Sequence, residues 1–237
     1  MKWLDLTLPG ASGNLACDEA LLEACEDSPD AEMLRFWEPR HYFVVLGYAN
    51  RAELEVNLAA CRKENVGIYR RCSGGGTVLQ GPGCLNYALV LNVARHRALC
   101  STGAANSYIM ERQRQALAGV LGRTVRVEGI TDLSLDGRKF SGNAQRRKRQ
   151  AMILHGTFLL HFDISLMGKF LRMPSRRPDY RQDRTHDQFL TNLEVPAALI
   201  KSALREAWSA AEYCQMPPVI PPRLEQKYAG EEWNLKF

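Results

Sequence analysis

The sequence predicts a single α+β domain with a mixed, largely antiparallel β-sheet flanked by helices. Several segments of strand character follow one another between Thr124 and Leu160 with no helix between them, whereas helical periodicity is confined to a few separate segments. No Pro-, Gly- or Ser-rich linker and no internal repeat divides the 237 residues. Because strands that adjoin directly tend to pair as neighbours, this order favours an α+β domain over a doubly wound parallel sheet.

The N-terminal part predicts helices and short strands in alternation. Leu and Ala recur at helical spacing after Ser12, Gly13 and Asn14, which favour a helix start, so the first helix should have about three turns. Aromatic and β-branched side chains favour two short strands joined by a turn, and a longer apolar run favours a buried strand. The expected elements after the first helix are strands at Met33–Trp37 and Tyr42–Leu46, a helix at Leu54–Glu64, and strands at Gly67–Arg71 and Leu85–Leu91.

The C-terminal part predicts a long helix, a run of strands and a last helix. Asp136-Gly137 is typical of a tight hairpin turn, because glycine accepts the positive φ that such a turn requires. The expected elements are a helix at Ala104–Leu121, strands at Thr124–Val127, Asp132–Leu135, Lys139–Ala144 and Met152–Leu160, a charged loop at Met173–Gln188, and a final helix at Ala197–Ala211.

Composition excludes several classes of protein. With 46% hydrophobic and 24% charged residues the chain is ordinary globular material, neither disordered nor fibrous. The longest charge-free stretch, Cys72–Ala94, is broken by glycines and a proline, so no transmembrane helix is expected. Seven cysteines without metal-ligand spacing, and a start without a signal-peptide pattern, predict a reduced cytoplasmic protein with neither a disulfide framework nor a zinc site.

The net charge of +5 is unevenly distributed. Residues 1–60 carry 4 basic and 11 acidic side chains, whereas residues 61–237 carry 27 and 15. The densest basic part is Arg138–Arg184, where 12 basic residues accompany 3 acidic ones. Such a part predicts contact with phosphate or with an acidic protein, although a solvated face without a function is the default for any charge run.

A glycine-rich loop follows a predicted strand and is preceded by two arginines. In Arg70-Arg71-Cys72-Ser73-Gly74-Gly75-Gly76-Thr77, three successive glycines let backbone N–H groups face a shared concavity that binds phosphate or carboxylate oxygens. Arginines supply donors for the same oxygens. The loop is neither a Walker A loop nor a dinucleotide fingerprint. A tight turn is the alternative, and the paired arginines favour an anion site.

Three polar residues on the later strands are the remaining candidates. Lys139 follows the hairpin turn and can reach a phosphate as a compact point charge. Asp132 can help to hold a divalent cation on a nucleotide. His155, in Leu154-His155-Gly156-Thr157, lies on the next strand, where a single histidine is more often structural than catalytic. Each of these residues has an ordinary structural alternative when it is considered alone.

In this order and spacing the segments resemble the catalytic domain of lipoate–protein ligases, within the superfamily that also contains octanoyltransferases and biotin–protein ligases. The resemblance covers nearly the whole chain. It includes Asn14-x-x-x-Asp18-Glu19 in the first helix, the arginine–glycine loop, the segment Asp-Gly-Arg-Lys-x-Ser-Gly-x-Ala-Gln at 136–145, and Trp233-Asn234 near the end. The sequence departs from the ligase pattern at Gln80-Gly81-Pro82-Gly83, which replaces a His-Asp and is closer to the octanoyltransferase loop.

The resemblance implies the biotin/lipoate ligase fold and a two-step reaction with ATP, Mg²⁺ and lipoate. Lipoate would be activated as lipoyl-adenylate and then transferred to a lysine of an acceptor protein, with Lys139 as the catalytic residue and Asp132 as the Mg²⁺ ligand. An apolar slot formed with Val45, Gly47 and Asn86 is expected to hold the acyl chain, although ordinary core is the alternative for these positions. The residues implied to bind ATP and the lipoyl-adenylate are Arg71, Ser73, Gly74, Gly75, Gly76, Thr77, Val78, Lys139, Ser141, Gly142, Ala144 and His155.

Two other functions stay open. An octanoyltransferase uses a cysteine thioester and no ATP, yet no cysteine lies between Cys100 and Cys214, where that family carries its nucleophile, and Cys72 and Cys84 are expected to be ordinary buried thiols. A non-catalytic protein that binds lipoyl-carrier domains is the second alternative. Arg146-Arg147-Lys148-Arg149 lacks interleaved aromatic residues, so nucleic acid is not the expected partner. Biotin ligation is not favoured, because its Gly-Arg-Gly-Arg type of loop is absent.

The expected partner is an acidic lipoyl-acceptor protein of the glycine-cleavage H protein type or the lipoyl-domain type of 2-oxoacid dehydrogenase E2. The chain ends at Phe237, soon after Trp233-Asn234. The resemblance therefore implies one catalytic domain over 1–237 without the accessory C-terminal domain of longer ligases. The resemblance then implies either that a separate accessory protein is required or that the ligase acts without one.

Overall fold

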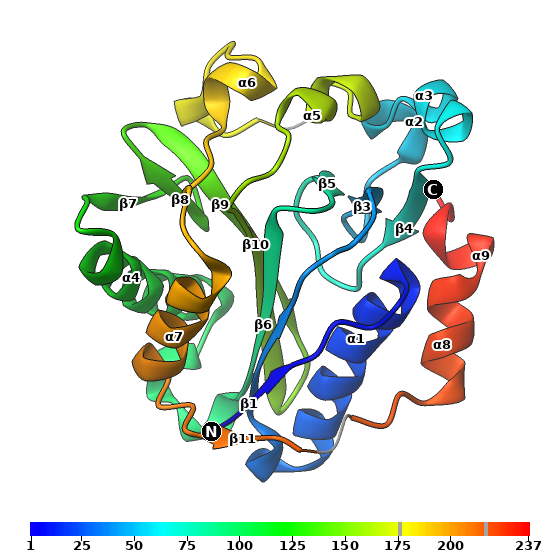
Figure 1. Cartoon of the computed structure of the whole chain (residues 1–237). Helices are drawn as coiled ribbons and strands as arrows, with labels where there is room; N and C mark the ends of the chain where they lie inside the picture. The colour runs from blue at the N-terminus through cyan, green and yellow to red at the C-terminus, as the bar shows by residue number, and fades with distance from the viewer. Residues whose placement is uncertain (175–176, 216–217) are drawn as a thin grey trace.

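The computed structural model describes residues 1–174, 177–215 and 218–237 and confirms the α+β class. Its main feature is an eight-stranded mixed sheet in the order β11-β1-β2-β6-β10-β9-β8-β7 (Figure 1). The strands that form it, in chain order, are β1 (Lys2–Asp5), β2 (Met33–Trp37), β6 (Cys84–Asn92), β7 (Val125–Glu128), β8 (Asp132–Leu135), β9 (Arg138–Arg147), β10 (Ala151–Leu159) and β11 (Glu212–Tyr213). The pairs β11-β1 and β1-β2 are parallel and the others are antiparallel.

A second, three-stranded sheet has the order β4-β3-β5. It consists of β3 (Phe43–Leu46), β4 (Gly67–Arg70) and β5 (Val78–Gln80). The glycine-rich loop connects β4 to β5, so this small sheet places that loop. Figure 1 shows the small sheet beside β6 and β10, below the short helices α2 (Ala52–Glu55), α3 (Leu58–Lys63), α5 (Ser165–Phe170) and α6 (His186–Phe189).

Longer helices cover the two faces of the large sheet. On one face lie α4 (Thr102–Leu121) and α7 (Ala197–Ala207), which pack against each other, and on the other face α1 (Ala11–Asp27) packs on β6 and β10 (Figure 1). The pair α8 (Pro222–Ala229) and α9 (Glu231–Asn234) continues this second layer, with α8 against α1 and α9 against β4. Helix α4 begins at the Ser101 cap, whose hydroxyl accepts from the Ala104 N–H, and ends at Gly122 with φ of 58°.

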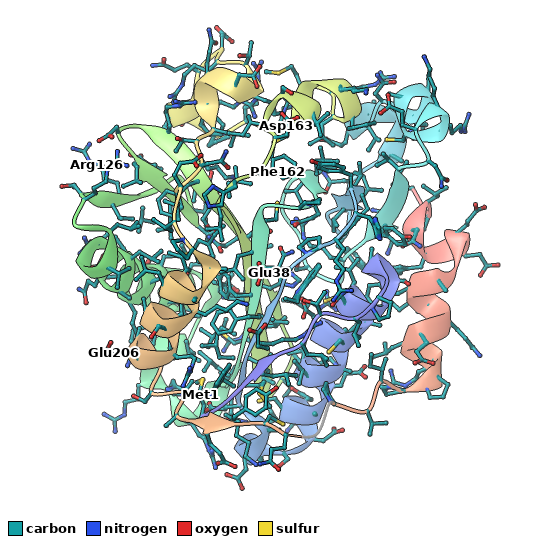
Figure 2. All side chains as sticks on the ribbon, viewed as in Figure 1. Met1, Glu38, Arg126, Phe162, Asp163 and Glu206 are labelled. Atoms are coloured by element: carbon teal, nitrogen blue, oxygen red, sulfur yellow. The ribbon has the colours of Figure 1, made fainter. Side chains whose placement is uncertain are left out.

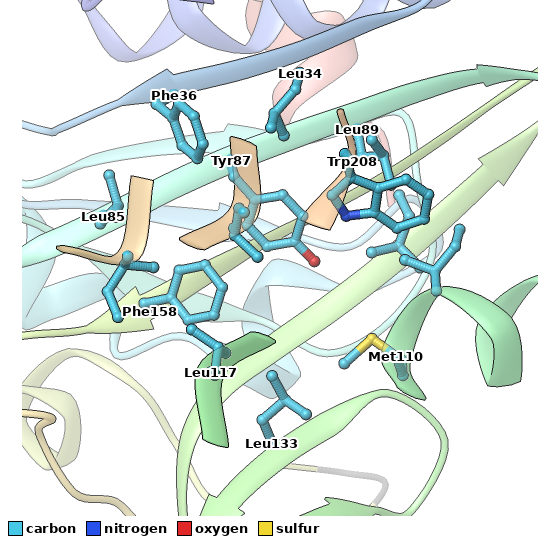
Figure 3. Close-up of a cluster of buried hydrophobic side chains, with 14 of the residues drawn as sticks. Leu34, Phe36, Leu85, Tyr87, Leu89, Met110, Leu117, Leu133, Phe158 and Trp208 are labelled. Carbon is cyan, nitrogen blue, oxygen red and sulfur yellow. The ribbon is translucent and has the colours of Figure 1, made fainter. Parts of the chain in front are cut away.

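The largest hydrophobic core lies between the sheet and the α4–α7 layer. Tyr87 of β6 and Phe158 of β10 stack at its centre with ring centroids 5.2 Å apart, next to Met110 and Leu117 of α4 (Figure 3). Side chains fill the space between the layers, while Arg126 and Glu206 lie on the outer surface (Figure 2). This face is therefore apolar core, and the polar side chains that we consider below lie on the opposite face.

Most of the predicted elements are confirmed, and the differences have physical causes. The Asp136-Gly137 hairpin is confirmed, with φ of 50° and 73° at its two residues. The two strands expected at Met33–Trp37 and Tyr42–Leu46 are present, but they do not pair with each other, because β2 pairs with β1 and β6 whereas β3 belongs to the small sheet. The turn-like sequence between them is a crossing between sheets.

The predicted helices differ from the structure in three places. The first helix begins at Ala11, so Ser12, Gly13 and Asn14 lie inside it, and its 17 residues exceed the expected length. The helix expected at 54–64 is two short helices, α2 and α3. The helix at Ala197–Ala207 is not the final one, since α8 and α9 follow it.

Several further elements were not expected from the sequence. The expected loop at 173–188 contains a 3₁₀ turn at Asp179–Arg181 and the start of α6, and its residues 175–176 lie outside the described part. The short strands β1, β5 and β11 were missed. No helix within the described ranges has both the length and the apolar character that a bilayer span requires.

Candidate functional site

The floor of the candidate site is the sheet face opposite the α4–α7 core. Strands β9 and β10 pair so that Gly142 lies opposite Thr157 and Ala144 opposite His155, and β6 places Asn86 opposite Thr157. Directly opposed residues share a face of a sheet, so these five residues lie on one surface. Because β9 contributes only a hydrogen and a methyl group here, its part of the floor leaves room for a ligand.

Four predicted residues belong to this floor, three of them from the adenylate set together with Asn86 from the acyl slot, whereas Ser141 does not. Gly142, Ala144 and His155 are brought together as the resemblance implied. Ser141 is paired with Leu133 and Phe158, and its side chain therefore points to the apolar face. Alternate residues of a strand point to opposite sides, which is why Ser141 can border the site only through its backbone.

The glycine loop lies over the floor at Ala144. Gly75 has φ of +86°, and a Cβ atom there would lie 2.9 Å from Arg71 Nη2 and 3.5 Å from Ala144 Cβ. Gly74 and Gly76 have open space where a Cβ would be. A side chain at 75 would thus be both strained and in conflict with Arg71, whereas a Cβ atom at either neighbouring glycine would meet no other atom.

Arg71 is buried under this loop and binds its carbonyl groups. Nη2 donates to the carbonyls of Gly74 at 2.6 Å and Gly76 at 2.7 Å, and Nε donates to Ser73 Oγ at 3.1 Å. Burial lowers the pKa of Arg71 to about 10. The sequence predicted that amide N–H groups of the loop converge on an anion. In the structure the carbonyls of Gly74 and Gly76 point toward Arg71, and an anion that binds Nη2 would have to take their place.

Arg70, expected to bind the same anion, has a structural role instead. Its guanidinium is fully buried and donates to the carbonyls of Gly47, Tyr48, Asn50 and Trp233 at 2.8–3.1 Å. Strand residues alternate in direction, and Arg70 of β4 points away from the loop that Arg71 supports. The expectation that both arginines contact an adenylate is therefore wrong for Arg70.

Lys139 lies next to the glycine position of the floor and is oriented by a carboxylate. Its Nζ is 2.8 Å from Asp132 Oδ1, and a Cβ atom at Gly142 would lie 2.7 Å from that nitrogen. The second oxygen of Asp132 accepts from the Tyr180 hydroxyl at 2.7 Å. Burial and the Asp132 carboxylate raise the pKa of Tyr180, so this hydroxyl stays protonated and donates.

The residues fit only weakly a magnesium site held by protein alone. Within the described ranges no group of three or more His, Cys, Asp or Glu side chains gathers around a common point. Both oxygens of Asp132 already have protein donors, Lys139 and Tyr180. The geometry thus supports Asp132 as the partner of Lys139, and its role as a Mg²⁺ ligand stays a prediction.

Gly47, predicted for the acyl slot, is required by the loop above it. A Cβ atom at Gly47 would lie 2.1 Å from the carbonyl oxygen of Gly75, which no substitution could accommodate without moving the loop. Val45 and Val78 are paired neighbours on β3 and β5 and belong to an apolar cluster with Trp37. That Val45 belongs to an acyl slot and that Val78 contacts the lipoyl-adenylate stay predictions, because the same contacts serve as core.

Asn86 belongs to a closed ring of hydrogen bonds with Gln80 and Thr157. Gln80 Nε2 donates to Thr157 Oγ1 at 2.6 Å, Thr157 Oγ1 donates to Asn86 Oδ1 at 2.5 Å, and Asn86 Nδ2 donates to Gln80 Oε1 at 3.0 Å. Gln80 thus replaces the histidine of the ligase pattern with an amide that completes the ring. Sequence reasoning did not identify Thr157 as a floor residue, although its place two residues after His155 was the available signal.

Other predicted residues have mixed positions. The hydroxyl of Thr77 is buried and has no hydrogen-bond partner among the described atoms. In the basic run, Lys148 pairs with Glu23 at 3.4 Å, whereas Arg146 and Arg149 are exposed. Sequence reasoning also missed Tyr180, for which no motif gave a signal.

Comparison with known proteins gives a family and two kinds of relative. Residues 11–207 match the model of the lipoyl protein ligase A/B catalytic domain. The chain is 29% identical over 238 residues to the probable lipoate-protein ligase A of Mycoplasma pneumoniae, covering 94% of this chain and 67% of that protein. It is also 29% identical over 270 residues to the octanoyltransferase LipM of Carboxydothermus hydrogenoformans, covering 100% and 98%.

Solved structures agree with the fold. A bipartite lipoate protein ligase of Thermoplasma acidophilum, studied with its E2 lipoyl domain, superposes with a TM-score of 0.82 at 24% identity, covering 99% of this chain and 95% of the other. A lipoate-protein ligase A bound with ATP gives a TM-score of 0.81 at 23% identity, covering 99% of both. The chain belongs to the lipoyl protein ligase A/B catalytic domain family.

Proposed function

We propose that this chain is an ATP-dependent lipoate–protein ligase, which activates lipoate as lipoyl-adenylate and transfers it to a lysine of an acceptor protein. The observation that carries the proposal is that two positively charged side chains lie next to the two small residues of β9, Gly142 and Ala144. Arg71 lies beside Gly75 over Ala144, and Lys139 lies over Gly142. Residues two apart on a strand lie about 7 Å from each other, a separation that suits the carboxylate and α-phosphate of one adenylate.

The chemistry requires charge stabilisation more than proton transfer by the enzyme. In the first step a lipoate carboxylate oxygen bonds to the α-phosphorus of ATP and pyrophosphate leaves. In the second step the amine of the acceptor lysine attacks the acyl carbon, AMP leaves and an amide forms. Lys139 and Arg71 would stabilise the negative charge on the carboxylate and phosphate oxygens, with Asp132 holding Lys139 in place. Mg²⁺ bound with the nucleotide would neutralise further phosphate charge.

The remaining parts of the proposal concern partners and location. An acidic lipoyl-acceptor domain, of the E2 or glycine-cleavage H protein type, would dock on the basic surface that includes Arg146 and Arg149. The structural relative from Thermoplasma acidophilum is bipartite and was studied with an E2 lipoyl domain, which supports such a partner and a separate accessory subunit. We propose that the reaction takes place in the cytoplasm, because seven scattered cysteines favour a reducing compartment.

An ATP-independent octanoyltransferase is the second candidate. The LipM relatives, which the chain covers along nearly their whole length, and the Gly81-Pro82-Gly83 loop favour it. The cysteines oppose it. None lies between Cys100 and Cys214, and burial raises the pKa of both Cys72 and Cys84 to about 12, which suppresses their thiolates.

Pyrophosphate release tests the ligase proposal. Wild-type protein is mixed with lipoate, ATP, Mg²⁺ and an acceptor lipoyl domain, with and without an accessory subunit, and we expect release that depends on lipoate. Lys139→Ala should lower the rate by a factor of about 10²–10³, the usual effect of removing one donor at a developing charge. The matched control is Lys169→Ala, since Lys169 forms a surface pair with Glu64 and should leave the rate unchanged.

A second arm distinguishes the two candidates. Octanoyl–acyl carrier protein replaces lipoate and ATP, and mass spectrometry detects the acceptor domain with its added acyl group. Acylation without ATP would identify a transferase and contradict the ligase proposal. Lipoate-dependent pyrophosphate release that survives in Lys139→Ala would instead refute our assignment of the site.

A further inference from the structure

Polar side chains alternate with alanines in one row across the site face of the large sheet. Strand pairing places Arg35 of β2 opposite Ala88 of β6, Ala88 opposite His155 of β10, and His155 opposite Ala144 of β9. All four therefore share a face. The small Ala88 leaves space between the two large polar side chains, and the carboxylate of Asp18, from the helix that packs on this face, lies in contact with both.

The Asp18 carboxylate links Arg35 to His155. Its Oδ1 accepts from Arg35 Nη1 at 2.5 Å, and its Oδ2 lies 3.3 Å from His155 Nδ1. The other N–H groups that Arg35 donates go to Asn14 and to the carbonyl of Leu6, and its side chain is fully buried. Because a carboxylate can only accept, Nδ1 carries a proton, and we infer that Nε2 is the acceptor on the other side of the ring.

The series of hydrogen bonds continues from His155 to the predicted anion site. Ser73 Oγ lies 2.5 Å from His155 Nε2 and donates to it, while the same oxygen accepts from Arg71 Nε at 3.1 Å. Each group thus donates in one direction, from Arg71 to Ser73, His155 and Asp18, and Arg35 donates to Asp18 from the other end. Hydrogen bonds that run in one direction polarise and strengthen one another.

Ser73, His155 and Asp18 have the order of a nucleophilic triad, but the surroundings exclude that role. The Ser73 side chain has no exposed surface, and its oxygen already receives a hydrogen bond from Arg71. Asp18 shares its carboxylate with Arg35, so it stabilises an imidazolium less than a triad carboxylate without such a partner does. These hydrogen bonds therefore orient side chains and do not activate Ser73 as a nucleophile.

We propose that Asp18 and Arg35, acting through His155 and Ser73, are positioning residues that set the orientation of the Arg71 guanidinium. Nε is held by Ser73 Oγ at 3.1 Å and by the Gly74 carbonyl at 3.2 Å, and Nη2 donates to the carbonyls of Gly74 and Gly76. Nη2 is thus the group that exchanges these carbonyls for ligand oxygens. The identity of that ligand, an acyl-adenylate, rests on the proposed function.

Asp18→Asn tests the chain, because it is isosteric and reverses one hydrogen bond. An asparagine turned with its oxygen to Arg35 presents N–H to His155 Nδ1, so the other tautomer forms and Nε2 becomes a donor to Ser73. The Ser73 oxygen then accepts from both His155 and Arg71 Nε and its own proton must turn elsewhere, which weakens its bond to Nε and leaves the Gly74 carbonyl as the other acceptor of that group. The matched control is Asp30→Asn, which removes a carboxylate from an exposed pair with Arg95.

Two measurements read out the effect. The first is the NMR signal of the Arg71 Nε–H group in the free protein, assigned by its absence in Arg71→Lys. The second is calorimetric binding of a non-hydrolysable sulfamoyl analogue of lipoyl-adenylate. Asp18→Asn should shift the signal and speed its exchange with solvent, and should weaken binding by about tenfold or more, the value of one charge-assisted hydrogen bond. Asp30→Asn should change neither.

A double-mutant cycle separates positioning from general stability. In a Ser73→Ala background the chain is already broken, so Asp18→Asn should cause no further loss of binding. Equal weakening by Asp18→Asn in both backgrounds, or an unchanged Arg71 signal, would overturn the proposal. If Asp18→Asn does not fold, the pair His155→Gln and His155→Leu replaces it, since only glutamine returns an acceptor to Ser73 and should restore binding.

The two proposals fail in different ways. Absence of analogue binding by the wild-type protein would count against the ligase function. The NMR signal of Arg71 would still report whether Asp18 controls the guanidinium, because that measurement needs no ligand.

Discussion

Replacing Arg70 with methionine tests whether the first of two adjacent arginines stabilises the fold instead of binding substrate. The buried guanidinium donates to the carbonyls of Gly47 at 2.9 Å, Tyr48 at 3.1 Å, Asn50 at 2.8 Å and Trp233 at 3.1 Å. A hydrogen bond from a charged group is worth about 1.5–3 kcal/mol. Because release of a buried cation offsets part of the sum, we expect the free energy of unfolding to fall by about 3 kcal/mol.

Thermal and urea unfolding measure this loss. For a domain of this size, 3 kcal/mol corresponds to a fall in melting temperature of about 6–12 °C. Arg71→Met is the comparison, since Arg71 donates mainly to Ser73 and to the exposed glycine loop and makes one long bond, of 3.5 Å, to the Val45 carbonyl. We expect Arg71→Met to lose less stability than Arg70→Met and to lose more affinity for the lipoyl-adenylate analogue.

Unchanged stability in Arg70→Met would refute this reasoning. The refutation would be complete if Arg70→Met kept the wild-type melting temperature and lost analogue binding as strongly as Arg71→Met. In that case both arginines would face the ligand, and the carbonyl contacts of Arg70 would carry no net free energy.

Two other predictions concern the loop and the thiols. Gly47→Ala should destabilise the protein by about 1–3 kcal/mol and weaken analogue binding, because its Cβ would lie 2.1 Å from the Gly75 carbonyl oxygen. Gly103→Ala, in helix α4 and with open space around the added Cβ, should not lower the melting temperature, since alanine is favoured over glycine in a helix. A melting temperature of Gly47→Ala equal to that of the wild type would contradict the close approach. At pH 8 a thiol reagent should label exposed Cys100 and leave Cys72 unmodified, because burial raises the Cys72 pKa to about 12 and keeps the thiolate rare at any lower pH. Peptide mass mapping of the folded protein checks this, and rapid labelling of Cys72 would reopen the thioester route.

Much of the fold was predictable because local chemistry determines it. The Asp136-Gly137 turn has the positive φ values that its residues favour, and it fixes the hairpin of β8 and β9. The uninterrupted apolar run at Leu85–Leu91 became the buried strand β6. Pairing between distant strands was less predictable. β2 and β3 are close in sequence and similar in composition, yet they belong to different sheets, because partners such as β1 and β4 decide their places.

The sequence by itself determined the family, the fold class and the charged residues that are candidates for ligand binding. Motifs such as the arginine–glycine loop and the segment around Lys139 are local, so spacing alone reveals them. Only the tertiary structure decided what each residue contacts. It separated Arg70, bound to the carbonyls of Gly47 and Trp233, from Arg71, bound to the carbonyls of the glycine loop, and it joined Asp18 to His155 across 137 residues. The physical reason is that direction and contact depend on strand alternation and sheet pairing, which bring together atoms that no sequence window contains.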